Sequence, residues 1–232
     1  MSPRSPDPRV KLALVDAAAR LLATEGPQAL TTRRLSAETG SSTMAVYTYF
    51  DGMTGLLREV VREGFARLQS HLGRVRTTRD PVADLALLGR AYRHNALANP
   101  HLYAAMFGGS PLAGFTLTEE DRQHGRYTLV NVAECTARCV SERRFASADP
   151  ALLAHQMWFG VHGLVTLELG GYLVEPWTAD RCFEAELVAL MVGAGDHADA
   201  ATRSVAASRR RFRGEIVIAA AVRRADTAPR AN

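Results

Sequence analysis

Two adjacent stretches of short polar side chains in the first fifty residues could hydrogen-bond to a nucleic acid. The first begins at Thr32, and the second offers the hydroxyl groups of Thr43, Tyr47 and Thr48. A hydroxyl group both donates and accepts hydrogen bonds, so it can contact base edges as well as phosphate oxygens. The residue types therefore indicate a candidate DNA-contacting surface.

The helices expected around these residues would hold them in place. We expect helices over about 9–24, from a Thr32 N-cap to Gly40, over 43–50 after a Ser42 cap, and from Met53 to about Arg76. Two short helices joined by a glycine turn are typical of a helix-turn-helix, whose second helix enters the ~12 Å major groove. Leu35, Val46 and Phe50 would anchor them. Two short helices of an ordinary bundle have the same spacing, so spacing alone leaves both interpretations open.

The segment from Ala29 to Phe50, ALTTRRLSAETGSSTMAVYTYF, resembles the TetR family of bacterial transcriptional regulators, and the resemblance extends over about residues 9–75. A second segment, Trp158 to Leu169, resembles the tryptophan, histidine and glycine signature of one subfamily of TetR ligand domains. The resemblance implies a homodimeric repressor that binds a palindromic DNA operator and releases it when a small-molecule effector binds the C-terminal domain.

The resemblance also implies roles for individual residues. Thr32 and Arg33 match the phosphate-contacting pair at the start of the second helix, where a guanidinium and the helix N-terminus both favour an anion. The residues that match the DNA-facing positions are Ser42, Thr43, Met44, Ala45, Tyr47, Thr48 and Tyr49. This helix contains no Arg, Asn or Gln, so we expect phosphate contacts to supply much of the affinity.

One position departs from the family pattern. Met53 stands where the family usually has a phosphate-contacting lysine. We therefore expect one phosphate contact to be missing. Arg4, Arg9 and Lys11 near the N-terminus could compensate for it.

Composition and charge bound the class of protein. The chain has 232 residues, 47% of them hydrophobic and 22% charged, as in an ordinary globular protein. No apolar run approaches the ~18 residues that a membrane-spanning helix needs, and residues 1–9 do not resemble a secretory signal, so we expect a cytoplasmic protein without a membrane partner. Residues 1–79 carry a net charge of +5, residues 80–196 one of −6, and residues 197–232 one of +5. A basic segment on an acidic body suits a nucleic-acid-binding module.

Helical periodicity continues through the rest of the chain and predicts an all-α protein. Further helices are expected over about 81–98, 101–107, 118–145, 149–172 and 178–195, with a surface loop over 108–117. With the resemblance, the expected domains are a disordered arm over 1–8, a helix-turn-helix domain over 9–55, a ligand-binding and dimerisation domain over 56–196, and a basic tail over 197–232. A long helix joins the first domain to the second. The tail is either a docked helix or partly disordered.

The acidic body holds candidate effector contacts, because effector sites are apolar pockets with a few polar groups. The candidate ligand-binding residues are Tyr92, Met106, Phe107, Arg126, Tyr127, Trp158 and His162. Trp158 and His162 are four residues apart and share a helix face. Each of these residues could equally be ordinary core or solvated surface. The effector is expected to be largely apolar.

The last two body helices are expected to form a four-helix bundle with those of a second copy. The candidate dimer-interface residues are Leu152, Leu164, Val165, Phe183, Leu187, Leu190 and Met191. Two-fold symmetry would then require a palindromic operator.

Other chemistries find little support in the sequence. The histidines lack the spacing of a metal site, and Cys135, Cys139 and Cys182 show no zinc or disulfide pattern, although Cys135 and Cys139 share a helix face. No phosphate loop, nucleophile elbow or His-Glu-x-x-His motif occurs, so we expect neither an enzyme nor a cofactor. The alternative function is an interaction module, or a small-molecule-binding protein, with a degenerate helix-turn-helix.

Overall fold

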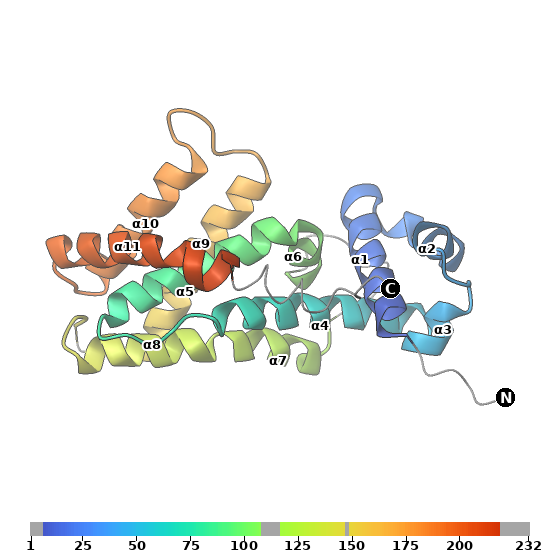
Figure 1. The fold of residues 1–232 in the computed structure, drawn as a ribbon, viewed down its shortest axis with the longest axis horizontal. Helices are drawn as coiled ribbons and strands as arrows, with labels where there is room; N and C mark the ends of the chain where they lie inside the picture. The colour runs from blue at the N-terminus through green and yellow to red at the C-terminus, as the bar shows by residue number, and fades with distance from the viewer. Residues whose placement is uncertain (1–6, 108–116, 147–148, 219–232) are drawn as a thin grey trace, which may run out of the picture. The chain divides into compact units, whose positions relative to one another are not determined.

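The computed structural model describes residues 7–107, 117–146 and 149–218, and this part of the chain consists of helices without strands (Figure 1). The all-α prediction is confirmed. Arg4, most of the predicted 108–117 loop and the arginines at positions 223 and 224 lie outside the described residues. The chain divides into two compact units, Met1–Arg67 with Asn99–Tyr127 and Leu68–Ala98 with Thr128–Asn232.

The first unit contains the helix-turn-helix. Its elements are α1 (Pro8–Glu25), the 3₁₀ turn η1 (Pro27–Ala29), α2 (Thr32–Thr39), α3 (Ala45–Phe50), most of α4 (Met53–Leu72), α6 (Pro100–Met106) and α7 (Glu119–Thr128). Leu14 and Leu21 of α1, Leu35 of α2, Val46 of α3 and Leu56 of α4 are almost fully buried. These side chains fix α2 and α3 against the longer helices, as the apolar spacing predicted for Leu35, Val46 and Phe50.

The turn between α2 and α3 is held by its own polar groups. Gly40 ends α2 with a φ of 65°, a left-handed conformation that favours glycine. The Thr39 hydroxyl donates to the carbonyl of Leu35 at 2.8 Å, and the Ser36 hydroxyl donates to that of Ser41. The angle between the two short helices is therefore set locally.

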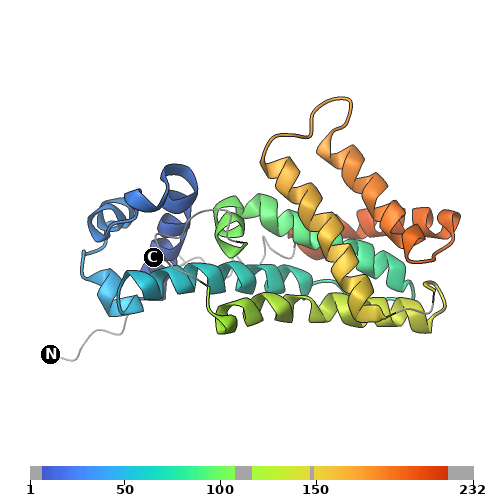
Figure 2. The ribbon, with the colours of Figure 1, turned by 180° about the vertical axis from the view of Figure 1, so that it is seen from behind.

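The second unit is a helical bundle around α5. It contains α5 (Pro81–Ala98), α8 (Val130–Ser141), α9 (Pro150–Leu169), α10 (Ala179–Gly193), α11 (Ala198–Phe212) and the π-helical turn η2 (Arg213–Ile218). Most of α5 is buried, because α8, α9 and α11 all pack against it. The hairpin of α9 and α10 is visible in Figure 2.

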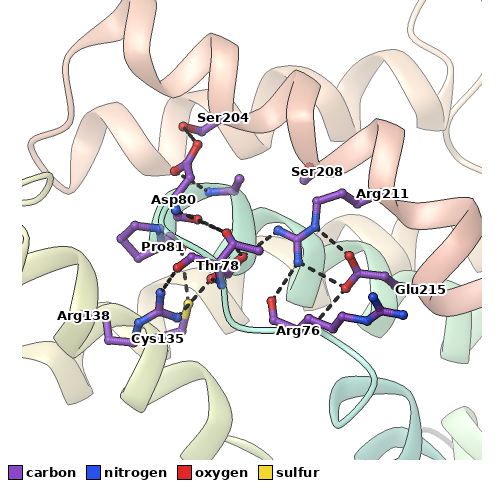
Figure 3. A network of polar contacts seen from close by, with 12 residues as sticks. Arg76, Thr78, Asp80, Pro81, Cys135, Arg138, Ser204, Ser208, Arg211 and Glu215 are labelled. Atoms are coloured by element: carbon purple, nitrogen blue, oxygen red, sulfur yellow. Dashed lines mark hydrogen bonds and ion pairs between the residues drawn. The ribbon is translucent and has the colours of Figure 1, made fainter.

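The basic tail is a docked helix from Ala198 to Phe212, which resolves that alternative for the described part of the tail. Arg211 of α11 pairs with Asp84 at 2.6 Å and with Glu215, while Ser204 donates to Asp80 at 2.8 Å. Figure 3 shows how this network encloses the connector 73–80 between α4 and α5. The helix that follows the predicted ligand domain therefore holds the start of α5.

The Asp84 carboxyl group lies almost fully buried at the centre of this network. Burial alone would raise its pKa, but hydrogen bonds from Thr78, Arg211 and Arg138 outweigh that effect and lower the pKa. Asp84 therefore remains an anion and ties α5 to α8 and α11.

Several predicted helix boundaries were wrong. The N-cap of α2 is Thr31, whose hydroxyl accepts from the backbone N–H of Arg34, and Thr32 is already helical. The first helical residue of α3 is Ala45, because residues 42–44 form a turn in which Ser42 accepts from Ala45. The fourth helix ends at Leu72, before Gly73. The helix predicted over 118–145 is two helices, α7 and α8, interrupted at Leu129, near the weak helix formers Gly125 and Thr128.

None of the helices in the described residues is both long and apolar enough to cross a membrane.

Candidate functional site

The start of α2 presents one arginine without an ion-pair partner among the described residues. Arg33 is exposed and forms no ion pair there, whereas its neighbour Arg34 pairs with Glu25 at 2.9 Å and with Glu38 at 3.0 Å. Arg20 is also engaged, with Glu38. Of these three arginines, Arg33 is the one whose charge is available for a phosphate.

The exposed face of α3 carries the polar and flexible side chains that the sequence predicted. Met44 is 63% exposed and Tyr47 is 58% exposed, and Ser42, Thr43 and Thr48 are exposed as well. The Thr48 hydroxyl donates to the carbonyl of Met44 at 3.1 Å, which leaves its oxygen able to accept. Exposed hydroxyl and thioether groups therefore occur both in the turn before α3 and on α3 itself.

Two residues predicted to face DNA lie elsewhere. Ala45 is buried, so its methyl group is not available to a thymine methyl group. The Tyr49 hydroxyl accepts a hydrogen bond at 2.8 Å from the backbone of Asp7, the N-cap residue of α1. In the described structure, Tyr49 thus anchors the beginning of α1 to α3.

The basic residues predicted to compensate for Met53 are already paired. Arg9 bonds to Asp7 at 2.9 Å, and Lys11 bonds to Glu59 at 2.5 Å. Met53 itself is half-buried at the first position of α4. Neither Arg9 nor Lys11 offers an unpaired charge in this structure, and Arg4 lies outside the described residues.

The second unit contains an apolar cavity of about 40 Å³ between α5, α8, α9 and α10. Its walls are mostly aliphatic and aromatic, and sequence reasoning had not assigned most of them to a ligand site. Those missed are Leu72, Leu85, Leu88, Gly89, Thr128, Leu129, Val132, Met157 and Val161. The signal for part of this set was present, because positions 85, 88 and 92 share one face of a helix.

A short chain of hydrogen bonds borders the apolar cavity. The indole N–H of Trp158 donates to the Tyr92 hydroxyl at 3.4 Å, and that hydroxyl lies 2.9 Å from Nδ1 of His162. Burial lowers the pKa of His162, so the imidazole is neutral at neutral pH. Tyr92 and Trp158 line the cavity, whereas His162, which contacts the Tyr92 hydroxyl, is not part of the lining, so the wall that is otherwise apolar carries a hydroxyl and an indole N–H.

The other predicted ligand residues belong to the first unit and do not line this cavity. Phe107 packs against Phe65, with ring centroids 5.8 Å apart, and Met106 lies close to Gly64. Arg126 pairs with Glu119, and Tyr127 is exposed. Aromatic and methionine content alone therefore could not assign these residues to one site.

Most of the predicted dimer residues lie inside the second unit. Four of the seven side chains are buried: Val165, Phe183, Leu187 and Met191. Leu164 and Leu190 are half-buried, and Leu152 is exposed. Leu187, Leu190 and Met191 line the apolar cavity. The physical reason is that α9 and α10 turn these side chains toward α5. Of the predicted set, only Leu152 is exposed in the described chain, so a face that meets a second copy needs further exposed residues beside it.

The cysteines are free thiols in the structure. A hydrogen bond from Cys135 and burial raise the pKa of Cys139, so that thiol stays protonated. The described residues contain no cluster of His, Cys, Asp or Glu that could hold a metal ion.

Two family models match the chain on either side of the connector. Residues 14–60 match the family described as "Bacterial regulatory proteins, tetR family", and residues 85–190 match "Tetracyclin repressor-like, C-terminal domain". Together they span more than half of the chain. No curated protein matches it at a significant level.

Solved structures share the fold. A protein of unknown function from Rhodococcus sp. RHA1 is 24% identical with a TM-score of 0.68, over 84% of this chain and all of that one. The TetR family regulator PfmR from Thermus thermophilus is 18% identical with a TM-score of 0.62, over 79% and 99%. RolR in complex with resorcinol is 15% identical with a TM-score of 0.56, over 85% and 93%. With both family models matched in chain order, this chain belongs to the TetR family of transcriptional regulators, which are DNA-binding proteins and not enzymes.

Proposed function

We propose that the protein is a cytoplasmic homodimeric repressor that binds a palindromic operator and releases it when a small molecule enters the apolar cavity. The observation that carries this proposal is the pairing, in one chain, of an exposed helix-turn-helix surface with an apolar cavity bordered by the Tyr92, Trp158 and His162 hydrogen bonds. The first recognises DNA, and the second accepts the signal.

The DNA contacts are proposed to divide into phosphate binding by α2 and base contact by α3. Arg33, which forms no ion pair with the other described residues, lies at the N-terminus of α2, where the helix dipole also favours an anion. Thr43 and Tyr47 can reach base edges or phosphates through their hydroxyl groups, and Met44 can contact a thymine methyl group. Much of the affinity should therefore depend on salt.

The dimer is proposed to form through the outer face of the α9 and α10 hairpin. Leu152, Phe159 and Leu167 of α9 are exposed large apolar side chains at spacings of seven and eight residues, so they lie along one stripe. Gly163 lies on the same stripe and has open space around it, which permits close approach of a second helix. A two-fold axis there would pair two recognition helices.

The effector is proposed to be small and largely apolar, with one group that hydrogen-bonds to Tyr92. RolR, which shares the fold, binds resorcinol, a small aromatic ring with hydroxyl groups. A ligand that binds better to the conformation with poorly spaced recognition helices shifts the population away from DNA, whereas one with equal affinity for both conformations has no effect.

The test is a fluorescence-anisotropy titration against DNA from immediately upstream of the protein's own gene, at several salt concentrations. We expect saturable, sequence-selective binding that the double variant Thr43→Ala/Tyr47→Ala loses while keeping its fold by circular dichroism. Binding that is absent at low salt, or equal for all DNA and unchanged in the variant, would instead support an interaction module with a degenerate helix-turn-helix.

A further inference from the structure

Helix α11 of the second unit has two faces of different chemistry. Its inner face packs against α5 and α10. The buried residues of that face are Ala201, Ser204, Val205 and Ser208. The outer side carries four exposed arginines, which we call the basic face: Arg203, Arg209, Arg210 and Arg213. At about 100° of rotation per residue, these four side chains leave the helix within about one third of its circumference.

The charges of the basic face are not compensated within the described part of the chain. None of its four guanidinium groups forms an ion pair or a hydrogen bond with another described residue. Arg211, which lies between them in sequence, instead turns toward the connector and pairs with Asp84 at 2.6 Å and with Glu215 at 2.8 Å (Figure 3). Asp199, an exposed acid one turn before Arg203, forms no ion pair with it. The end of α11 thus has one arginine that stabilises the fold and others that face solvent.

The arginines of the basic face repel one another. Arg213 follows Arg210 by three residues and Arg209 by four, and like charges at these spacings weaken a helix. Cations in the last turn of a helix interact favourably with its dipole, which accounts for Arg209 and Arg210. The dipole does not account for Arg203, which lies nearly two turns earlier. An anion that lies along the basic face would remove the repulsion.

The length and composition of the basic face indicate which anion fits. Arg203 and Arg213 are ten residues apart, about 15 Å along a helix. One strand of B-form DNA presents a phosphate every ~3.4 Å along its axis, so about four phosphates fall within that length. Guanidinium groups bind phosphate oxygens with paired hydrogen bonds. A protein partner would be expected to meet apolar or aromatic side chains at the centre of the contact, whereas Ala206, the exposed residue between Arg203 and Arg209, offers a methyl group. A phosphate backbone therefore fits this face better than a protein surface does.

We propose that the basic face of α11 is a second DNA-contacting surface, which binds the phosphate backbone without reading the sequence. This surface is separate from α2 and α3, and it does not depend on the proposed effector cavity. Its contacts add a sequence-independent, electrostatic part to the affinity, the part that keeps a regulator on DNA outside its operator.

The test measures binding to a fluorescein-labelled duplex of about 30 bp and scrambled sequence, so that no operator has to be known. Fluorescence anisotropy is recorded from about 50 to about 200 mM salt for the wild type and for Arg210→Gln/Arg213→Gln. Each lost phosphate contact lowers the slope of log K against log salt by about 0.9, which corresponds to about 3.5-fold in affinity over this salt range. For each basic face that contacts the duplex, the affinity of the wild type should therefore fall about tenfold more than that of the variant.

The matched control removes two exposed arginines from another part of the second unit. Arg79→Gln/Arg143→Gln makes the same change in net charge, and neither arginine forms an ion pair with another described residue. Its slope should equal that of the wild type. Adding the two α11 substitutions to Thr43→Ala/Tyr47→Ala should lower the slope of that protein by the same amount as in the wild type, because the two surfaces are independent. Circular dichroism checks that each variant keeps its helices.

The outcomes separate this inference from the proposed helix-turn-helix contacts. If both arginine double variants lower the slope equally, net charge explains the effect and the inference is wrong. If neither changes the slope while DNA from upstream of the protein's gene is still bound selectively, the inference is wrong and the helix-turn-helix proposal stands. A wild type that binds no duplex at the lowest salt would overturn both. Stripping of the wild type, but not of Arg210→Gln/Arg213→Gln, from the duplex by poly-glutamate at equal charge would assign the face to an acidic protein instead.

Discussion

Individual side chains decide which charges of the first unit are available to DNA. Most of its cations are used within the unit: Arg34 pairs with Glu25 and Glu38, and Lys11 pairs with Glu59. Arg33 is the exception at the start of α2. A count of basic residues therefore overestimates the phosphate-binding capacity, and the pairing of each cation has to be known.

Replacing Arg33 by Gln should weaken operator binding about equally for all sequences. Removal of one phosphate contact per protomer should reduce the slope of log K against log salt by about 0.9 for each protomer. Arg34→Gln is the matched control on the same helix, since its charge is already compensated by Glu25 and Glu38, and it should leave the slope unchanged. Equal slopes for the wild type and Arg33→Gln would remove Arg33 from the interface. Anisotropy titrations at five salt concentrations measure the effect.

Because of His162, the free energy of unfolding of the protein should decrease in mild acid. Burial lowers its pKa in the folded state, so the unfolded chain binds a proton more readily below the ordinary histidine value of 6.5. The free energy of unfolding should therefore fall as pH drops below 6.5, and less so in His162→Asn, whose amide oxygen can still accept from Tyr92. Urea denaturation at pH 7.5 and 5.5 measures the difference between the two proteins. Parallel losses in both would show that His162 does not contribute.

At the scale of elements, the sequence predicted where helices lie better than what their faces meet. Periodicity located α1, α5 and the α9 and α10 pair, because an apolar stripe has to be buried against something. Periodicity could not tell whether Leu187 faced a second copy or α5. It also could not tell whether Phe107 and Tyr92 belonged to one site, because both questions depend on contacts between residues distant in sequence. The observed helix caps differ from the predicted ones by one or two residues for a similar reason. Threonine is a good N-cap at both position 31 and position 32, and in the structure Thr31 has the extended backbone of the N-cap.

The junction of α3 and α4 depends on the absence of a side chain at Gly55. A Cβ there would collide with the backbone carbonyl of Phe50, the last residue of α3. Gly55→Ala should therefore destabilise the first unit by about 1–3 kcal/mol and weaken DNA binding. Gly214→Ala, at an exposed glycine with nothing within 4 Å of its Cβ position, should change stability by less than about 0.5 kcal/mol. Thermal unfolding of both variants is the measurement, and an unshifted Gly55→Ala transition would contradict the packing.

The proposed function depends on two copies acting together, and the exposed stripe of Leu152, Phe159 and Leu167 on α9 is the proposed contact. Phe159, the middle residue of this stripe, is 58% exposed. Phe159→Glu should convert the dimer to a monomer, because a carboxylate buried against an apolar face costs several kcal/mol. Operator affinity should fall with it, since a monomer contacts one half-site. Leu97→Glu, at an exposed leucine of α5 away from the stripe, is the control. Analytical ultracentrifugation decides the point, and a dimeric Phe159→Glu protein would exclude this face.

The docking of α11 limits how this regulator can be recombined with others. The match to the C-terminal family model ends at residue 190, yet Arg211 and Ser208, well beyond it, bond to Asp84 and Arg90 on the buried helix α5. A chimera that borrowed the ligand domain only as far as that boundary would leave two charged groups of its central helix short of partners. A ligand domain that is exchanged between such regulators should therefore include residues through Ile218, so that α11 and its contacts with α5 are transferred with it.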